Sequence, residues 1–134
     1  MSTIFSRIIA GEIPCFKIEE DENFLALLDV NPLVKGHTLV IPKVEIDYIF
    51  DVEDEMLAQM IVFSKKVARK LQSKIPCKRI GVSVIGLEVP HAHIHLILRF
   101  IAALPHAQGN GSSRHVTQLV LPIAICYRDV WGLT

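Results

Sequence analysis

The chain carries no excess of charge of either sign. Its 134 residues include 14 Lys and Arg and 14 Asp and Glu, so the formal net charge at pH 7 is zero. Proteins that hold nucleic acids or anionic membranes by electrostatics carry a basic excess or a basic patch. We therefore expect neither a nucleic acid nor a membrane among the partners of this protein.

Cysteine is scarce, and signals for export or membrane insertion are lacking. Cys15, Cys77 and Cys126 are far apart and form no Cys-x-x-Cys pair. Three dispersed cysteines favour free thiols in a reducing compartment over a disulfide framework or a zinc ribbon. The first residues do not resemble a signal peptide, and no segment approaches the ~18 apolar residues of a membrane span. These features predict one soluble, cytoplasmic domain.

Three histidines at alternate positions, His91, His93 and His95, are the most informative feature of the sequence. Alternate side chains of a β-strand point to the same face of a sheet. A strand here would carry the three imidazoles on one face and the apolar residues between them on the other. Imidazole titrates near neutral pH and acts as a nucleophile, acid, base or metal ligand. The pattern therefore predicts a rigid platform for a functional site.

The residues alone leave two other interpretations of this row open. The histidines would then cover a solvated strand face or form an internal stabilising network. Alternatively, alternating histidines supply two zinc ligands, and a catalytic zinc needs a third ligand from His, Cys, Asp or Glu.

Periodicity and turn residues predict an α+β domain core over residues 1–98. The clearest helix is expected at 51–72, with Asp51 as its N-cap. Its predicted apolar stripe consists of Met56, Leu57, Met60, Ile61, Val67, Ala68 and Leu71. Strands are expected at 16–19, 24–30, 37–41, 80–85 and 91–98, and a short helix at 5–10 that Gly11 closes. We therefore expect a mostly antiparallel sheet of about five strands, one long helix and a short N-terminal helix.

Residues 99–134 differ in composition from the rest of the chain. They contain no Lys, no Glu and one Asp, and they include the loop-like segment 110–113 and an apolar run at 119–126 interrupted by Pro122. We expect an atypical C-terminal segment that is poorly ordered or forms a weakly specified strand. Out-of-frame translation of the closing segment would produce such a break in composition.

Residues 89–97, Val-Pro-His-Ala-His-Ile-His-Leu-Ile, resemble the signature of the histidine-triad (HIT) superfamily of nucleotide-binding hydrolases and transferases. Residues 4–14 resemble the opening helix and turn of that family. Residues 28–32 and 36–43 resemble its nucleoside-pocket strand and the strand beside it. The four motifs occur in the family's order, cover about residues 3–97 and are most similar to the short bacterial nucleotide-binding branch.

The resemblance implies a catalytic role for each histidine of the cluster. His93 would attack the α-phosphorus of a nucleoside 5′-phosphate derivative and form a nucleotidyl-histidine, which water then hydrolyses. His95 would hydrogen-bond the phosphate or the bridging oxygen, His91 would orient the nucleophile, and His37 would join the cluster from a facing strand. A neutral imidazole is nucleophilic at pH 7 without losing a proton, so no metal or other cofactor is expected.

The same resemblance implies a pocket for a purine nucleotide of the AMP type. Asp29 would accept hydrogen bonds from the ribose hydroxyls. The other residues expected at the nucleotide are Ile8, Leu27 and Val30 at the base and Gly86, Glu88 and Val89 near the phosphate. Taken without the family, His37 is a packed strand histidine, Asp29 a turn residue and the apolar residues part of the core.

Several positions depart from the family pattern. Ile80 and Leu87 replace amide side chains that contact phosphate in many members, and Glu88 stands where some members have Ser or Thr near the leaving group. Members with a structural zinc carry Cys and His where this chain has Ser6 and Glu45, which disfavours that metal here.

The resemblance thus implies a homodimeric, metal-independent hydrolase that cleaves nucleoside 5′-phosphoramidates or related nucleoside 5′-phosphate derivatives. One alternative is a non-catalytic nucleotide-binding or scaffolding protein. A less favoured one is a metal-dependent hydrolase that uses the histidine row.

Overall fold

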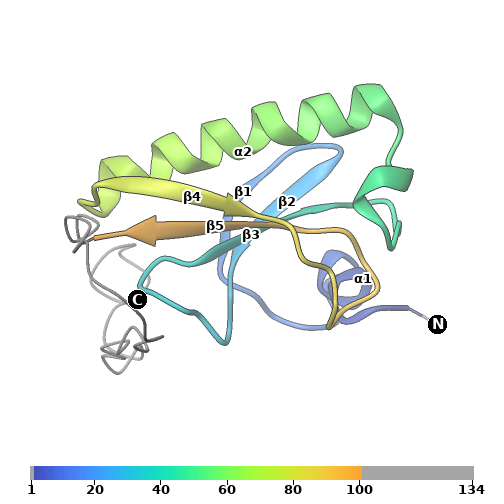
Figure 1. Cartoon of the computed structure of the whole chain (residues 1–134). Coiled ribbons are helices and arrows are strands. Elements are labelled where there is room, and N and C mark those ends of the chain that lie inside the picture. Colours follow the sequence, from blue (N-terminus) through green and yellow to red (C-terminus); the bar gives the residue numbers. More distant parts are fainter. Residues whose placement is uncertain (1, 101–134) are drawn as a thin grey trace, which may run out of the picture.

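The computed structural model describes residues 2–100, and within them the predicted α+β architecture is confirmed (Figure 1). Five strands form one antiparallel sheet in the order β1-β2-β3-β5-β4. The strands are β1 (Lys17–Glu20), β2 (Phe24–Leu28), β3 (Thr38–Pro42), β4 (Arg79–Ser83) and β5 (Ile94–Arg99). The helices are α1 (Ile4–Ile9), α2 (Asp54–Lys74) and a short 3-10 helix, η1 (Ile49–Asp51). The structure and order expected for residues 101–134 lie outside the described residues.

The long helix α2 covers one face of the sheet, and α1 lies on the opposite side (Figure 1). Alternate strand residues and one stripe of α2 make up the larger core cluster. Its buried members are Ile18, Phe24, Ala26, Leu28, Val40, Met60, Phe63, Val67, Leu71, Ile75, Ile94, Leu96 and Leu98. Full burial of each large apolar side chain contributes about 1.5–3 kcal/mol. This face is therefore structural, and the face that carries α1 remains for a site.

Helix α2 begins three residues later than the sequence predicted. The carboxylate of Glu53 accepts a hydrogen bond from the Met56 amide, so Glu53 is the N-cap, whereas Asp51 ends η1. The prediction of Asp51 as the cap was wrong because the 3-10 turn already uses that segment. Within the stripe, Phe63 is buried, whereas Ile61 is 52% exposed, so Ile61 was assigned to the wrong face.

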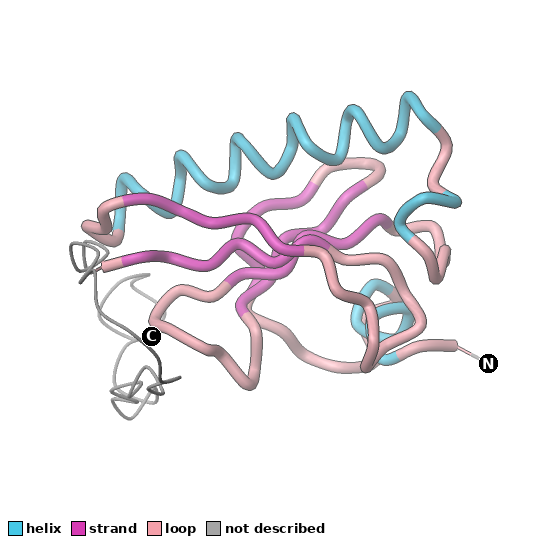
Figure 2. Tube along the Cα trace, in the orientation of Figure 1, coloured by secondary structure: helices cyan, strands magenta, loops and turns pink. Residues whose placement is uncertain are grey.

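A second, smaller core cluster lies on the α1 face of the sheet. It consists of Phe5 from α1 together with Leu25, Leu27, Leu39 and Ile41 from β2 and β3. Ile8, Ile9, Cys15 and Val89 pack against it and are partly buried. The connection from β4 to β5 runs down to α1 and back, which places it at the edge of this cluster (Figure 2).

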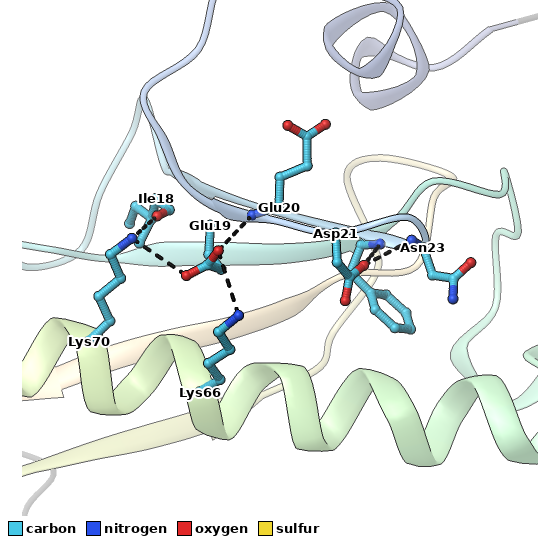
Figure 3. Close-up of polar contacts among 8 residues, drawn as sticks. Ile18, Glu19, Glu20, Asp21, Asn23, Lys66 and Lys70 are labelled. Carbon is cyan, nitrogen blue, oxygen red and sulfur yellow. Dashed lines mark hydrogen bonds and ion pairs between the residues drawn. The ribbon is translucent and has the colours of Figure 1, made fainter.

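Edge strand β1 is attached to α2 by polar contacts at its irregular register between Lys17 and Glu19. Lys70 of α2 donates a 2.6 Å hydrogen bond to the carbonyl of Ile18. Its Nζ also lies 3.5 Å from the carboxylate of Glu19, and Lys66 lies 3.7 Å from the same group (Figure 3). Exposed ion pairs contribute about 0–1 kcal/mol each, so these contacts orient β1 more than they stabilise the domain.

The predictions about cysteines and membrane spans can be compared with the structure only for residues 2–100. In the described part, Cys15 and Cys77 are free thiols, whereas Cys126 lies outside it. Across residues 2–100, no helix combines the length and the apolar character that a membrane span requires.

Candidate active site

The histidine row begins before the strand that was predicted to hold all of it. Strand β5 starts at Ile94, so only His95 of the three is a strand residue. The amide of His91 donates to the carbonyl of Val89, and the amide of Ala92 donates to Ile46, a loop residue. The backbone amides of His91 and Ala92 thus donate to loop carbonyls rather than to β3, and the strand begins only after them.

His93 has a defined tautomer. Its Nδ1 lies 2.7 Å from the backbone carbonyl of His91. Because a carbonyl can only accept, Nδ1 carries the proton, and Nε2 of the neutral ring keeps its lone pair. The ring is buried and lies edge-on to Phe5 and to His95, with centroids 5.2 and 4.8 Å away. The arrangement therefore presents Nε2 as a nucleophile that needs no deprotonation.

His37 and His95 form a hydrogen-bonded pair with an equally defined direction. The amide of Leu33 donates to Nδ1 of His37 at 3.1 Å, so the proton of neutral His37 sits on Nε2. That Nε2 lies 3.0 Å from Nδ1 of His95 and donates to it. Neutral His95 then carries its own proton on Nε2. The chain Leu33–His37–His95 makes Nε2 of His95 a hydrogen-bond donor.

Burial keeps this pair neutral. Desolvation lowers the pKa of His37 below its usual value, against a smaller opposing effect of the Asp29 carboxylate. Desolvation is also the main cause of the lowered pKa of His95, and the neighbouring His93 and His37 add to it. Asp29 and Glu88 oppose that shift. Both rings are therefore neutral at pH 7, as the directed hydrogen bonds require.

His91 lies deepest of the four histidines and is held at both ring nitrogens. Its Nε2 donates to the carbonyl of Pro42 at 2.8 Å, and its Nδ1 lies 3.0 Å from Oγ1 of Thr3. The ring of Phe5 packs edge-on against that of His91, with centroids 5.7 Å apart. Sequence reasoning missed both Thr3 and Phe5. The available signal was Thr3 as a helix N-cap directly before an aromatic residue.

Asp29 directly follows β2, and its carboxylate contacts both a backbone amide and a histidine. One carboxylate oxygen accepts from the Asn31 amide at 2.9 Å, and the other lies 3.7 Å from Nε2 of His37. The turn role that the sequence allowed is thus present, and the same carboxylate is part of the histidine cluster. A carboxylate in this position can accept hydrogen bonds from a vicinal diol beside the histidines.

The remaining residues predicted for the nucleotide are divided between the small core and the surface. Leu27 is buried in the small core, and Ile8 and Val89 pack against it. Val30 is 77% exposed, beyond the end of β2. Gly86 has φ of +71°, a conformation that side chains disfavour, and it sits in the same loop as the exposed Glu88.

The departures from the family pattern have clear places in the fold. Ile80 of β4 packs against the large core, so a polar group is absent there for a packing reason. Leu87 is 87% exposed in the loop between β4 and β5. The hydroxyl of Ser6 donates a hydrogen bond to the carboxylate of Glu45, which lowers the pKa of Glu45.

Asp29, His37 and His95 are also the group that could hold a metal ion among the described residues, with ligand atoms within 4.8 Å of one another. Two imidazoles and a carboxylate suit zinc. However, the atom of His37 that faces the group is Nε2, and the Leu33 amide keeps the proton there. The hydrogen bonds of this cluster therefore favour proton donation toward His95 over metal ligation.

Known proteins match both the histidine motif and the fold around it. The family model for the HIT domain matches residues 10–101. The chain belongs to the HIT family. The Bacillus subtilis protein named "Protein hit" is 39% identical over 104 residues, which cover 72% of this chain and 70% of that protein. The resemblance drawn from four short motifs is thereby confirmed.

Solved structures of HIT proteins have the same architecture. A member of the HIT family from Bacillus subtilis has a TM-score of 0.71 at 34% identity, covering 79% of this chain and 82% of that one. A HIT family hydrolase from Legionella pneumophila has a TM-score of 0.63 at 35% identity, covering 72% of this chain and 91% of that one. The fold of this HIT protein is thus a hydrolase-type fold.

Proposed function

We propose that this HIT protein hydrolyses nucleoside 5′-phosphoramidates, or closely related nucleoside 5′-phosphate derivatives, with His93 as the nucleophile. The observation that carries the proposal is the 2.7 Å contact between Nδ1 of His93 and the carbonyl of His91. It fixes the ring proton on Nδ1 and leaves a lone pair on Nε2, as attack on phosphorus requires.

The reaction would proceed by two displacements at phosphorus. Nε2 of His93 forms a bond to the α-phosphorus as the bond from phosphorus to the leaving nitrogen breaks. The leaving nitrogen takes a proton from solvent and departs as the amine, while Nε2–H of His95 donates a hydrogen bond to that nitrogen or to a phosphoryl oxygen. The oxygen of a water then bonds to phosphorus as the bond from phosphorus to Nε2 of His93 breaks, and the water returns a proton to solvent, which releases the nucleoside monophosphate and restores His93.

An adenosine 5′-derivative is the substrate type that the surroundings support best. The carboxylate of Asp29 lies within 3.7 Å of the histidine cluster, where ribose hydroxyls of a bound nucleoside would donate to it. For the base, Ile8 and Val89 offer partly buried apolar side chains that pack on the small core containing Leu27. A flat purine would bury more apolar surface there than a pyrimidine.

We also propose that the protein is a homodimer joined along β4. This strand ends the sheet formed by residues 2–100, and an edge strand presents N–H and C=O groups to a further strand. The outward side chain of Val82 is 61% exposed, and Val84 and Ile85 just beyond the strand are exposed as well. An apolar edge of this kind suits pairing with a second copy.

The decisive experiment is a single-turnover reaction with a fluorogenic adenosine 5′-phosphoramidate in EDTA. Wild type, His93→Ala and the control Lys66→Ala, on the opposite face of the sheet, are compared. We expect turnover in wild type and control, and no turnover in His93→Ala with AMP binding retained. Quenching at alkaline pH and mass analysis should find the nucleotidyl group on the peptide that contains His93.

Each other outcome has a defined meaning. Equal turnover by His93→Ala ends the assignment of the nucleophile. Turnover that requires zinc and is abolished by EDTA favours the metal-dependent alternative at Asp29, His37 and His95. AMP binding without turnover in wild type favours a nucleotide-binding protein, an alternative that Leu87 and the acidic Glu88 support because neither is a neutral phosphate ligand.

A further inference from the structure

We propose that Thr3, Ser6 and Glu45 form a positioning network that holds the ring of His91 and, through the backbone of His91, fixes the tautomer of His93. The network lies behind the histidines, at the start of α1 and in the loop after β3. This inference rests on the proposed role of His93 and adds to it the residues that keep its Nε2 free.

The network is a continuous chain of polar contacts. Oγ1 of Thr3 lies 3.0 Å from Nδ1 of His91 and 3.0 Å from Oγ of Ser6. The Ser6 hydroxyl donates to the carboxylate of Glu45. At the other end, Nε2 of His91 donates to the carbonyl of Pro42. The imidazole of His91 is therefore held at both nitrogens and cannot rotate without breaking a buried hydrogen bond.

Thr3 has a local role as well, which makes its position definite. Its Oγ1 accepts a 3.1 Å hydrogen bond from the backbone amide of Ser6, so Thr3 is the N-cap of α1. Thr3 is buried, although it precedes the first helix and lies 88 positions from His91. The cap thus ties the start of α1 to the catalytic segment.

The connection to His93 runs through the main chain. The carbonyl that accepts the hydrogen bond from Nδ1–H of His93 is the backbone carbonyl of His91. If the ring of His91 turned, the peptide after it would be free to move, and the proton of His93 would no longer be confined to Nδ1. Phe5 completes the support because its ring contacts both His91 and His93. A displacement near 1 Å of a reacting group lowers rates by as much as about 100-fold.

Glu45 supplies the charged end of the network. It is an exposed residue, yet its carboxylate accepts from Ser6, and this hydrogen bond is the main cause of its lowered pKa. An ionised acceptor makes the stronger hydrogen bond, so the Ser6 hydroxyl stays directed toward it. Since Nε2 of His91 donates to Pro42, the Thr3 hydroxyl donates to Nδ1 of that ring, while the Ser6 amide donates to Oγ1 of Thr3 and so keeps Thr3 tied to Ser6.

The test combines kinetics with the ring protons observed directly. Thr3→Val keeps the shape of the side chain and removes the hydroxyl, and Thr3→Ser restores it. We expect Thr3→Val to lower kcat about tenfold while the Kd for AMP changes less than about twofold. Thr3→Ser should recover most of the rate. In ¹⁵N-histidine spectra, His93 should be the Nδ1–H form in wild type and a mixture of tautomers in Thr3→Val.

A second pair of variants covers the case in which loss of the cap prevents folding. Glu45→Ala removes the exposed end of the network, and Glu12→Ala removes an exposed carboxylate that pairs only with Arg7 among the described ion pairs. We expect Glu45→Ala to shift the His91 signals and lower kcat, and Glu12→Ala to do neither.

The outcomes separate this inference from the proposed function. If wild type shows no turnover, the proposed function fails, and the positioning network is then tested only by the ¹⁵N spectra of His91 and His93. Unchanged spectra of His91 and His93 in both Thr3→Val and Glu45→Ala overturn it. An unchanged kcat in an active protein overturns it as well, even if the spectra change.

Discussion

Nε2 of His37 lies 3.0 Å from Nδ1 of His95, and the proton between them belongs to His37 because the Leu33 amide occupies its other nitrogen. His37 thereby decides which nitrogen of His95 carries a proton. It is the link between a loop amide and the face of the sheet on which His93 and His95 lie.

Replacing His37 should therefore impair chemistry more than binding. His37→Phe keeps a buried ring and removes the N–H donor, so His95 loses the partner that directs its proton to Nε2. We expect kcat for the phosphoramidate to fall about 100-fold, with the Kd for AMP nearly unchanged. Stopped-flow rates and calorimetric binding measure the two quantities. An equal rise in Kd and loss of rate would assign His37 to the binding of nucleotide instead.

The same pair should make stability depend on pH. The pKa values of His37 and His95 are lowered in the folded protein, chiefly by burial. Below about pH 6.5 the unfolded chain therefore binds more protons than the folded one. The free energy of unfolding should decrease as the pH falls from 6.5, by up to about 1.4 kcal/mol per pH unit for each extra proton. Denaturant titrations of wild type and His37→Phe test this. The variant should show the smaller slope, and equal slopes would contradict the assignment.

The sequence predicted the sheet well because its strands are short and bounded by turn residues, and the central strands β2 and β3 are apolar. The exposed face of α2 was harder. Ile61 was placed in the core and Phe63 was overlooked, whereas the buried apolar stripe is Met60, Phe63, Val67 and Leu71. The sequence pattern also does not show that Asp51 belongs to the 3-10 helix η1 and that Glu53 therefore caps α2.

Some features of the site could not be predicted from short sequence motifs. The motif identified the histidines, but their protons depend on Leu33, Pro42 and the carbonyl of His91, which are backbone groups brought close only by the fold. Thr3 is likewise remote in sequence from the ring that it contacts. The alternation of histidine and apolar residues predicted that the histidines gather on one side of the sheet. The tautomer of each histidine follows only from backbone partners that the tertiary structure brings close.

Asp29 should discriminate ribose from sugars that lack hydroxyls. Asp29→Asn keeps an oxygen that can accept from the Asn31 amide but removes the negative charge. We expect AMP to bind about tenfold more weakly and 2′,3′-dideoxy-AMP to bind equally to both proteins, because a hydrogen bond to a charged group contributes about 1.5–3 kcal/mol. Asp21→Asn is the matched control, since Asp21 caps a turn in the same way through the Asn23 amide. Equal losses for both ligands would show that Asp29 acts through the turn.

Glu88 should restrain activity by repelling the phosphate. Its carboxylate lies close enough to His95 to raise the pKa of that ring against the effect of burial, and the negatively charged phosphoryl oxygens of a bound substrate would approach the same region. We expect Glu88→Ser to raise kcat/KM several-fold at low salt and less at high salt, where exposed charges are screened. Glu22→Ser, at an exposed turn on another part of the chain, should change nothing. A decrease in kcat/KM for Glu88→Ser would indicate that the carboxylate assists the leaving group.

The edge of the sheet provides the last test. If β4 pairs with β4 of a second copy, the mass in solution should be twice the 15.0 kDa of one chain. A charged side chain on an edge strand opposes pairing, since it must lose water or face its own copy. We expect Val82→Lys to lower the measured mass toward the monomer, whereas Val44→Lys, at an exposed valine outside the strands, should not. Light scattering after gel filtration, over a range of concentrations, distinguishes the two states. A wild-type monomer at every concentration would refute the dimer, and a dimer that Val82→Lys leaves intact would place the interface on another surface.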